Sequence, residues 1–233
     1  MFESTTGICL HYYKYSESSV VVKIFTEDFG LQSYIINGVR NKKSKSKLIH
    51  LQSLNLLNLE VTNNKKRKIQ YIKEFRVIRN TNNLNCNMTK RLTSLYVSEI
   101  LLKVLVEAEQ ENKLFIFVCD VINEIHKRDS LSKNFSLIFL LNLSLYLGFY
   151  PNINDCEKSL FDLESGCFTD KHVHYNIKGK NKEYFKLLLL NETVNIPYKN
   201  RISILKSLQK YYSLHHYNIE NLKSIDVINS LRT

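Results

Sequence analysis

The chain has too few cysteines, and too irregularly spaced, to carry a disulfide framework. Its 233 residues include five cysteines, an odd number without a repeated spacing: Cys9, Cys86, Cys119, Cys156 and Cys167. Disulfide frameworks use even numbers of cysteines at regular spacings in small secreted chains. We therefore expect reduced thiols and exclude the class of small disulfide-bonded secreted proteins.

Glycine and long apolar runs are also scarce. The six glycines form no GxxxxGK pattern followed by Ser or Thr, which excludes the phosphate-cradling loop of P-loop NTPases. The longest apolar run, residues 135–150, contains Asn142, Ser144 and Gly148 and falls short of the roughly 20 residues of a membrane span. We expect no signal peptide, because the residues after Met1, FESTTG, are mostly polar. These features predict a globular cytoplasmic protein.

Negative charge is missing from residues 29–59, and a dense basic loop lies within that stretch. Residues 30–37 alternate as a strand with two different faces, and Gly38 ends them. Five cations follow within eight positions: Arg40, Lys42, Lys43, Lys45 and Lys47. Such a loop can bind nucleic-acid phosphates, because each neutralised phosphate releases condensed counterions. The alternative is a loop that is merely solvated.

The distribution of charge favours the nucleic-acid interpretation. Residues 1–79 carry 14 Lys and Arg against 6 Asp and Glu, whereas residues 80–233 carry 19 against 16. Most of the net charge of +11 therefore lies in the first third of the chain. An excess confined to one segment, with a pI near 9.3, indicates a polyanionic partner for that segment.

The hydrophobic periodicity changes near residue 80. Before it, about five strand-like segments in some 80 residues predict a small closed barrel. After it, apolar residues follow helical spacing. The first predicted helix starts at Thr89. Four more are predicted over residues 112–127, 133–149, 197–214 and 219–231. We expect an α+β fold with domains at 1–79 and 80–233, and an irregular insertion around residues 152–182.

The residues of the first segment resemble the start of the bacterial RecO recombination mediators. The matching pattern is a glycine and an apolar strand, then Glu-Ser, Phe-Thr, a glycine and a Gly-x-Arg basic loop. It is carried by Gly7, Glu17, Phe25, Thr26, Gly30, Gly38, Arg40 and Ser44. Residues 147–151, 161–163 and Gly166 resemble the second domain of that family. The resemblance therefore covers nearly the whole chain.

The resemblance implies an N-terminal OB-fold barrel joined to an all-helical domain, without enzymatic activity. It also implies binding of single- and double-stranded DNA and annealing of complementary strands. RecR and single-strand binding protein are the implied partners in loading RecA, and the implied location is the nucleoid. One departure is Asn37, which stands where many members have a lysine. We expect Lys42 or Lys43 to replace that phosphate contact.

A second departure concerns metal. Some RecO members carry paired Cys-x-x-Cys zinc motifs, whereas only Cys156 and Cys167 stand in the corresponding part of this chain. A zinc site could still combine these thiols with His172 and His174. Isolated cysteines more often act as small buried hydrophobic residues, so we predict no metal, no cofactor and no catalytic role for Cys156 with His172.

Aromatic and additional basic residues extend the predicted DNA surface. OB-type barrels stack bases on exposed aromatic side chains, and Tyr34 is our candidate because its strand leads into the basic loop. Other tyrosines on or near the predicted strands are Tyr12, Tyr13, Tyr15 and Tyr71. A second cationic run either extends the DNA path or caps a solvated hairpin: Lys65, Lys66, Arg67 and Lys68.

The helical domain is the predicted site for a protein partner. The acidic, apolar-ended tail of single-strand binding protein would bind an apolar groove from residues 92–106 and 131–150. Cations close by in sequence are Lys90, Arg91, Lys103, Arg128 and Lys133. The alternative is that these leucines only fill the core. Two other functions stay open for the chain: a general nucleic-acid-binding OB protein, and a helical scaffold with an incidental basic loop.

Overall fold

The structure is a computed structural model that describes residues 2–39, 46–79, 88–107, 109–127 and 131–224. The chain divides into two compact units, Met1–Asp129 with Leu222–Thr233, and Ser130–Asn221. The first unit therefore includes helices that follow residue 80, and the predicted domain boundary there stays a prediction.

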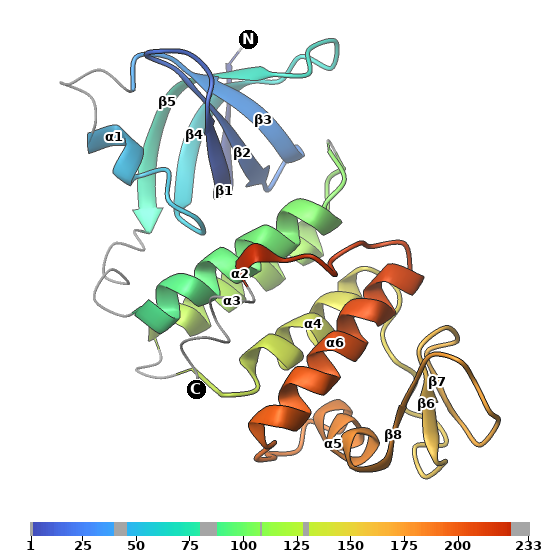
Figure 1. The fold of residues 1–233 in the computed structure, drawn as a ribbon. Coiled ribbons are helices and arrows are strands. Elements are labelled where there is room, and N and C mark those ends of the chain that lie inside the picture. Colours follow the sequence, from blue (N-terminus) through green and yellow to red (C-terminus); the bar gives the residue numbers. More distant parts are fainter. Residues whose placement is uncertain (1, 40–45, 80–87, 108, 128–130, 225–233) are drawn as a thin grey trace. The chain divides into compact units, whose positions relative to one another are not determined.

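The first unit begins with a closed five-stranded barrel (Figure 1). The strands follow the order β1-β2-β3-β5-β4, and only β3 and β5 pair in parallel. Residues 2–8 of β1 pair with β4, and residues 7–14 pair with β2, so this long strand joins both halves of the barrel. The strand bounds are β1 Phe2–Lys14, β2 Val20–Thr26, β3 Gly30–Ile36, β4 Leu56–Thr62 and β5 Gln70–Arg79.

The barrel interior is filled by one side of each strand, as expected when successive side chains point to opposite faces. A short helix, α1 (Ser46–Ile49), precedes β4, and Val39 and Leu51 on either side of it join the barrel core. The predicted small barrel is confirmed. Its core consists of Cys9, Val20, Val22, Ile24, Tyr34, Ile36, Val39, Leu51, Leu57, Leu59 and Val61.

Two helices pack with the barrel in the first unit, α2 (Met88–Val104) and α3 (Asn112–Lys127). The Ser98 hydroxyl on α2 donates to the Leu10 carbonyl, at the bulge of β1. Phe115 on α3 contacts Phe25 edge-on, with ring centroids 5.5 Å apart. Lys23 pairs with Glu107 between the two helices. Apolar, polar and ionic contacts thus join barrel and helices into one unit.

The second unit combines three helices with a small antiparallel sheet of order β7-β6-β8. Tyr212 on one helix donates to the Leu140 carbonyl on another at 2.6 Å, which ties α6 to α4. Phe149 lies among the rings of Tyr211, Tyr212, His215 and Tyr217. The bounds are α4 Phe135–Tyr146, β6 Leu160–Asp162, β7 Cys167–Thr169, β8 Asn176–Lys178, α5 Gly179–Leu189 and α6 Tyr198–Leu214.

The predicted α+β fold is confirmed, with one addition to the helical part. The expected irregular insertion at 152–182 contains the strands β6, β7 and β8, and the following α5 was not predicted. The helix expected over 219–231 does not start at Ile219, because residues 219–222 are not helical. Residues 225–231 of that prediction lie outside the described residues.

Two glycines of the barrel provide a matched stability test. Gly30 and Gly38 both adopt left-handed backbone angles, with φ of 64° and 73°. A Cβ on Gly30 would lie 1.9 Å from the Glu109 carbonyl oxygen, whereas a Cβ on Gly38 would meet no atom within 4 Å. We expect Gly38→Ala to cost about 1 kcal/mol and Gly30→Ala about 1–3 kcal/mol more, measured by denaturant unfolding. Equal losses would contradict the close approach of Glu109.

Candidate nucleic-acid interface

The basic loop begins and ends at residues that belong to the barrel core. Gly38 ends the segment after β3, and the buried Val39 follows it. Beyond the loop, Leu48 of α1 packs against the same core. Four of the predicted phosphate contacts lie outside the described residues: Arg40, Lys42, Lys43 and Lys45. The fifth, Lys47, is exposed on α1.

A row of exposed aromatic residues lies beside the start of this loop. Four exposed residues at the end of β1 and in the turn to β2 form what we term the hairpin rim: Tyr12, Tyr13, Lys14 and Tyr15. The side chains of Tyr13 and Tyr15 are 51% and 62% exposed. Lys14 pairs with Val20, and Val20 pairs with Ile36, so the rim adjoins the residues that lead into the loop.

Asn37 helps to hold the β1–β2 hairpin beside the end of β3. Its side-chain oxygen accepts a hydrogen bond from the Ser19 hydroxyl at 2.9 Å, which joins the β1–β2 hairpin to the first residue after β3. The residue that departs from the family pattern therefore has a structural contact in this chain. An amide accepts such a bond, whereas a lysine ammonium can only donate.

Tyr34 is buried, so our prediction that its ring is exposed for base stacking is wrong. Its side chain is 0% exposed and belongs to the barrel core, opposite Val22 on β2. Burial raises the pKa of the Tyr34 phenol. Alternation identified two faces of β3, but it did not identify which face is internal. Tyr34 shares its face with Ile36, and this apolar neighbour is the signal that could have placed it inside.

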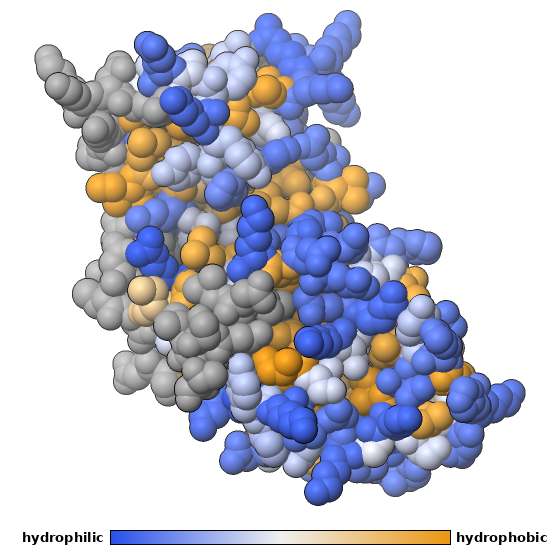
Figure 2. Space-filling view, in the orientation of Figure 1, coloured by the Kyte–Doolittle hydropathy of each residue, from blue (hydrophilic) through white to orange (hydrophobic). Residues whose placement is uncertain are grey.

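The second cationic run, Lys65 to Lys68, lies on the turn between β4 and β5, and all four side chains are exposed. Figure 2 shows hydrophilic side chains projecting from the surface where Figure 1 draws this turn. The Arg67 guanidinium carbon lies 5.6 Å from the centre of the Tyr71 ring. The barrel therefore presents aromatic and cationic side chains both at the hairpin rim and at this turn.

Comparison with known proteins identifies the family. Residues 1–81 match the family model "Recombination protein O N terminal", and residues 88–224 match "Recombination protein O C terminal". The chain belongs to the RecO family. It is 30% identical to the DNA repair protein RecO of Flavobacterium psychrophilum over 96% of both chains. The corresponding protein of Christiangramia forsetii is 31% identical over 99% of both chains.

RecO proteins are non-enzymatic mediators of DNA repair and recombination. This agrees with the expectation that the chain is not an enzyme. Its function therefore depends on surfaces that bind other molecules. Among the helices that the structure describes, none is long and apolar enough to cross a membrane.

The residues considered for zinc lie in and around the small sheet of the second unit. Cys156 and Cys167 are free thiols, and His174 contacts the ring of Tyr175, with centroids 4.4 Å apart. His172 is exposed. Within the described part of the chain, no group of three or more His, Cys, Asp or Glu could hold a metal ion. These four side chains are therefore not arranged as a zinc site.

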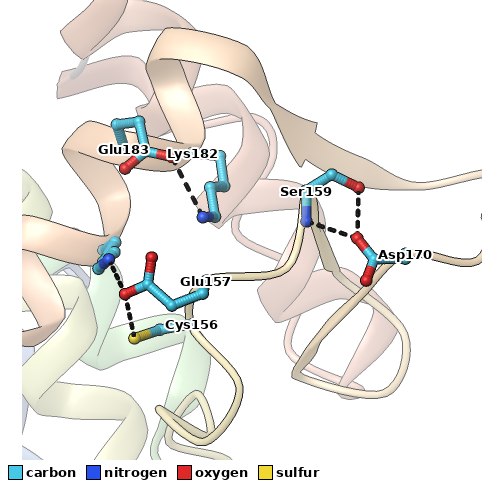
Figure 3. A network of polar contacts seen from close by, with 7 residues as sticks. Cys156, Glu157, Ser159, Asp170, Lys182 and Glu183 are labelled. Carbon is cyan, nitrogen blue, oxygen red and sulfur yellow. Dashed lines mark hydrogen bonds and ion pairs between the residues drawn. The ribbon is translucent and has the colours of Figure 1, made fainter.

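Polar contacts join the segments around this sheet (Figure 3). The backbone amide and hydroxyl of Ser159 both donate to Asp170, each at 2.9 Å, which lowers the pKa of Asp170. Glu157 accepts hydrogen bonds from Lys186 and from the Cys156 thiol. In Figure 3 Lys182 extends from α5 between these groups. Because Ser159 and Asp170 lie 11 residues apart in the sequence, their contact closes the loop between them.

The cations predicted for partner binding belong to two different units of the structure. Lys90 on α2 donates to the His126 carbonyl at 3.2 Å, and Arg91 and Lys103 are exposed on the same helix. Arg128 lies outside the described residues. Lys133 is exposed just before α4, in the second unit. These residues do not form one described surface.

The tyrosines provide a test of the interface. We expect Tyr13→Ala and Tyr15→Ala each to weaken binding of single-stranded DNA by about 1–3 kcal/mol, because each removes an exposed stacking surface. Both changes should leave the melting temperature nearly unchanged. Tyr34→Ala should instead lower stability by about 3–5 kcal/mol through a core cavity. Tyr34→Phe is the matched control, and lost DNA affinity in a stably folded Tyr34→Phe protein would contradict the assignment.

Proposed function

We propose that the chain is a DNA-binding recombination mediator. It binds single- and double-stranded DNA, anneals complementary strands and, with RecR, helps load RecA onto strands coated by single-strand binding protein. The observation that carries this proposal is the hairpin rim beside the residues that lead into the basic loop. The relatives named above are DNA repair proteins, which agrees with this proposal.

Exposed rings and cations play different parts in this mechanism. Rings stack on bases without sequence preference, because every base has a π-face, while cations neutralise phosphates. The hairpin rim offers three tyrosines and Lys14, and the sequence that follows β3 carries five cations. Two strands held by such contacts lose part of their mutual repulsion, which favours annealing. Chemistry of this kind needs neither metal nor nucleotide.

The first test replaces the five loop cations, Arg40, Lys42, Lys43, Lys45 and Lys47, by alanine. Each single-strand phosphate contact contributes a slope of about −0.7 to the logarithm of affinity against the logarithm of salt concentration. We expect the slope to become shallower by up to about 3.5, with similar losses for all DNA sequences. An unchanged slope in a folded variant would contradict the assignment. Annealing of complementary strands coated by single-strand binding protein then separates a mediator from a general nucleic-acid-binding protein.

The apolar partner site is best proposed on α4 alone. Helix α2 buries most of its apolar residues, and it belongs to the other unit. On α4, three apolar side chains at helical spacing are exposed: Ile138, Leu145 and Tyr146. An apolar stripe with Lys133 nearby suits the acidic, apolar-ended tail of single-strand binding protein.

A labelled tail peptide tests this site on the full chain at low salt, where charge assistance is greatest. We expect Ile138→Ser with Leu145→Ser to weaken binding at least about tenfold, because the two exposed apolar anchors are lost. Ile116→Ser on α3, at a residue about as exposed as Leu145, should have no effect. Unchanged binding in the α4 variant would place the tail elsewhere.

A further inference from the structure

The connection between α2 and α3 binds the barrel along one edge of β3. Within the described barrel, β3 pairs with β5 only at Tyr34 and Ile35, near the end of β3. Leu31, at the start of β3, instead forms a parallel bridge with Glu107 of the connection. A bridge of this kind satisfies backbone polar groups that an open strand edge exposes. The connection therefore occupies a part of β3 that β5 does not cover.

We term residues 105–107 and 109–111 of this connection the acidic strap. It contains no Lys or Arg, and it carries three carboxylates: Glu107, Glu109 and Glu111. A Cβ on Gly30 would lie 1.9 Å from the Glu109 carbonyl oxygen, so the strap passes close to the β2–β3 turn. The Gln110 side chain donates to the Glu27 carbonyl in the same turn at 3.5 Å. Several backbone contacts thus hold the strap against the β2–β3 hairpin.

The strap places one carboxylate on a cation of the barrel. Glu107 accepts a hydrogen bond from the Lys23 ammonium on β2, and these partners are 84 residues apart in the sequence. It also accepts from the Ser33 hydroxyl on β3 at 3.4 Å. The hydrogen bond from Lys23 lowers the pKa of Glu107, and the charge of Lys68 acts in the same direction. Glu107 is therefore ionised at neutral pH and neutralises Lys23.

Lys23 lies on the outer face of the barrel, close to exposed rings. Its neighbours on β2 belong to the barrel core, so its side chain points outward. Two residues along β2, about 7 Å away, Val21 lies on the same face. Val21 pairs with Tyr13 and with Ile35, and Ile35 pairs with Tyr71. Tyr13 and Tyr71 are 51% and 43% exposed. A single strand stacked on these rings would bring a phosphate close to Lys23.

We propose that the acidic strap is an autoinhibitory element, in which the Glu107 carboxylate competes with nucleic-acid phosphate for Lys23. This inference rests on the proposed function, because it concerns regulation of the same DNA surface. Carboxylate and phosphate oxygens accept the same charge-assisted hydrogen bonds from an ammonium group. The pair is partly exposed, with 25% of the Lys23 side chain and 58% of the Glu107 side chain accessible, so a phosphate can replace the carboxylate.

The test measures binding of a fluorescein-labelled oligothymidylate to the full chain by anisotropy over a salt series. We expect E107Q to raise the affinity about two- to fivefold at low salt, because the ion pair that it removes is weak. The slope of the logarithm of affinity against the logarithm of salt concentration should become steeper by about 0.7, for one further phosphate contact. The matched control, E109Q, removes the same charge from the strap but keeps the Lys23–Glu107 pair. It should raise the affinity less than E107Q does.

A double variant separates release of Lys23 from a general change in charge. K23Q should lower the affinity more in the E107Q background than in the unmodified chain, where Glu107 already neutralises Lys23. In the unmodified chain, K23Q should flatten the salt slope by much less than about 0.7. Because Glu107 is exposed, E107Q should leave the melting temperature nearly unchanged.

Three results would overturn the inference while DNA binding stands. The first is an E107Q gain no larger than that of E109Q. The second is an equal cost of K23Q in both backgrounds. The third is a full loss of about 0.7 in slope for K23Q in the unmodified chain, because Lys23 would then already bind phosphate. If neither the unmodified chain nor E107Q binds the strand, the proposed function itself is wrong.

Discussion

The parallel pairing of β3 with β5 closes the barrel, and both candidate DNA surfaces depend on it. Tyr34 and Ile35 lie opposite Gln70 and Tyr71, and no other strand pair of the barrel is parallel. Tyr34 fills the core from one strand, while Gln70 holds the β4–β5 turn from the other. The basic loop follows the same β3. The short parallel pairing of β3 with β5 therefore positions Tyr34 in the core, the β4–β5 turn and the start of the basic loop.

The two units obtain local order from different interactions. The barrel is held by a continuous apolar core. Around the small sheet, short strands bury little apolar area, and polar contacts such as that of Ser159 with Asp170 join the segments. Lys182 is almost fully buried there, between Glu183 at 3.1 Å and the Phe168 ring at 5.5 Å. Its ion pair and cation–π contact offset the cost of burying a charge.

The sequence predicted long helices and strands better than short ones, because a longer element shows more repeats of its hydrophobic period. Helix α3 is found at its predicted bounds, Asn112–Lys127, because sixteen amphipathic residues give a clear 3.6-residue period. Strands β6, β7 and β8 have three residues each, too few for any period to be recognised. Tyr34 shows a different limit, since alternation defines two faces but only packing shows which is internal. The contacts of Gln70 could not be predicted, because a glutamine between Ile69 and Tyr71 looks like any outward strand residue.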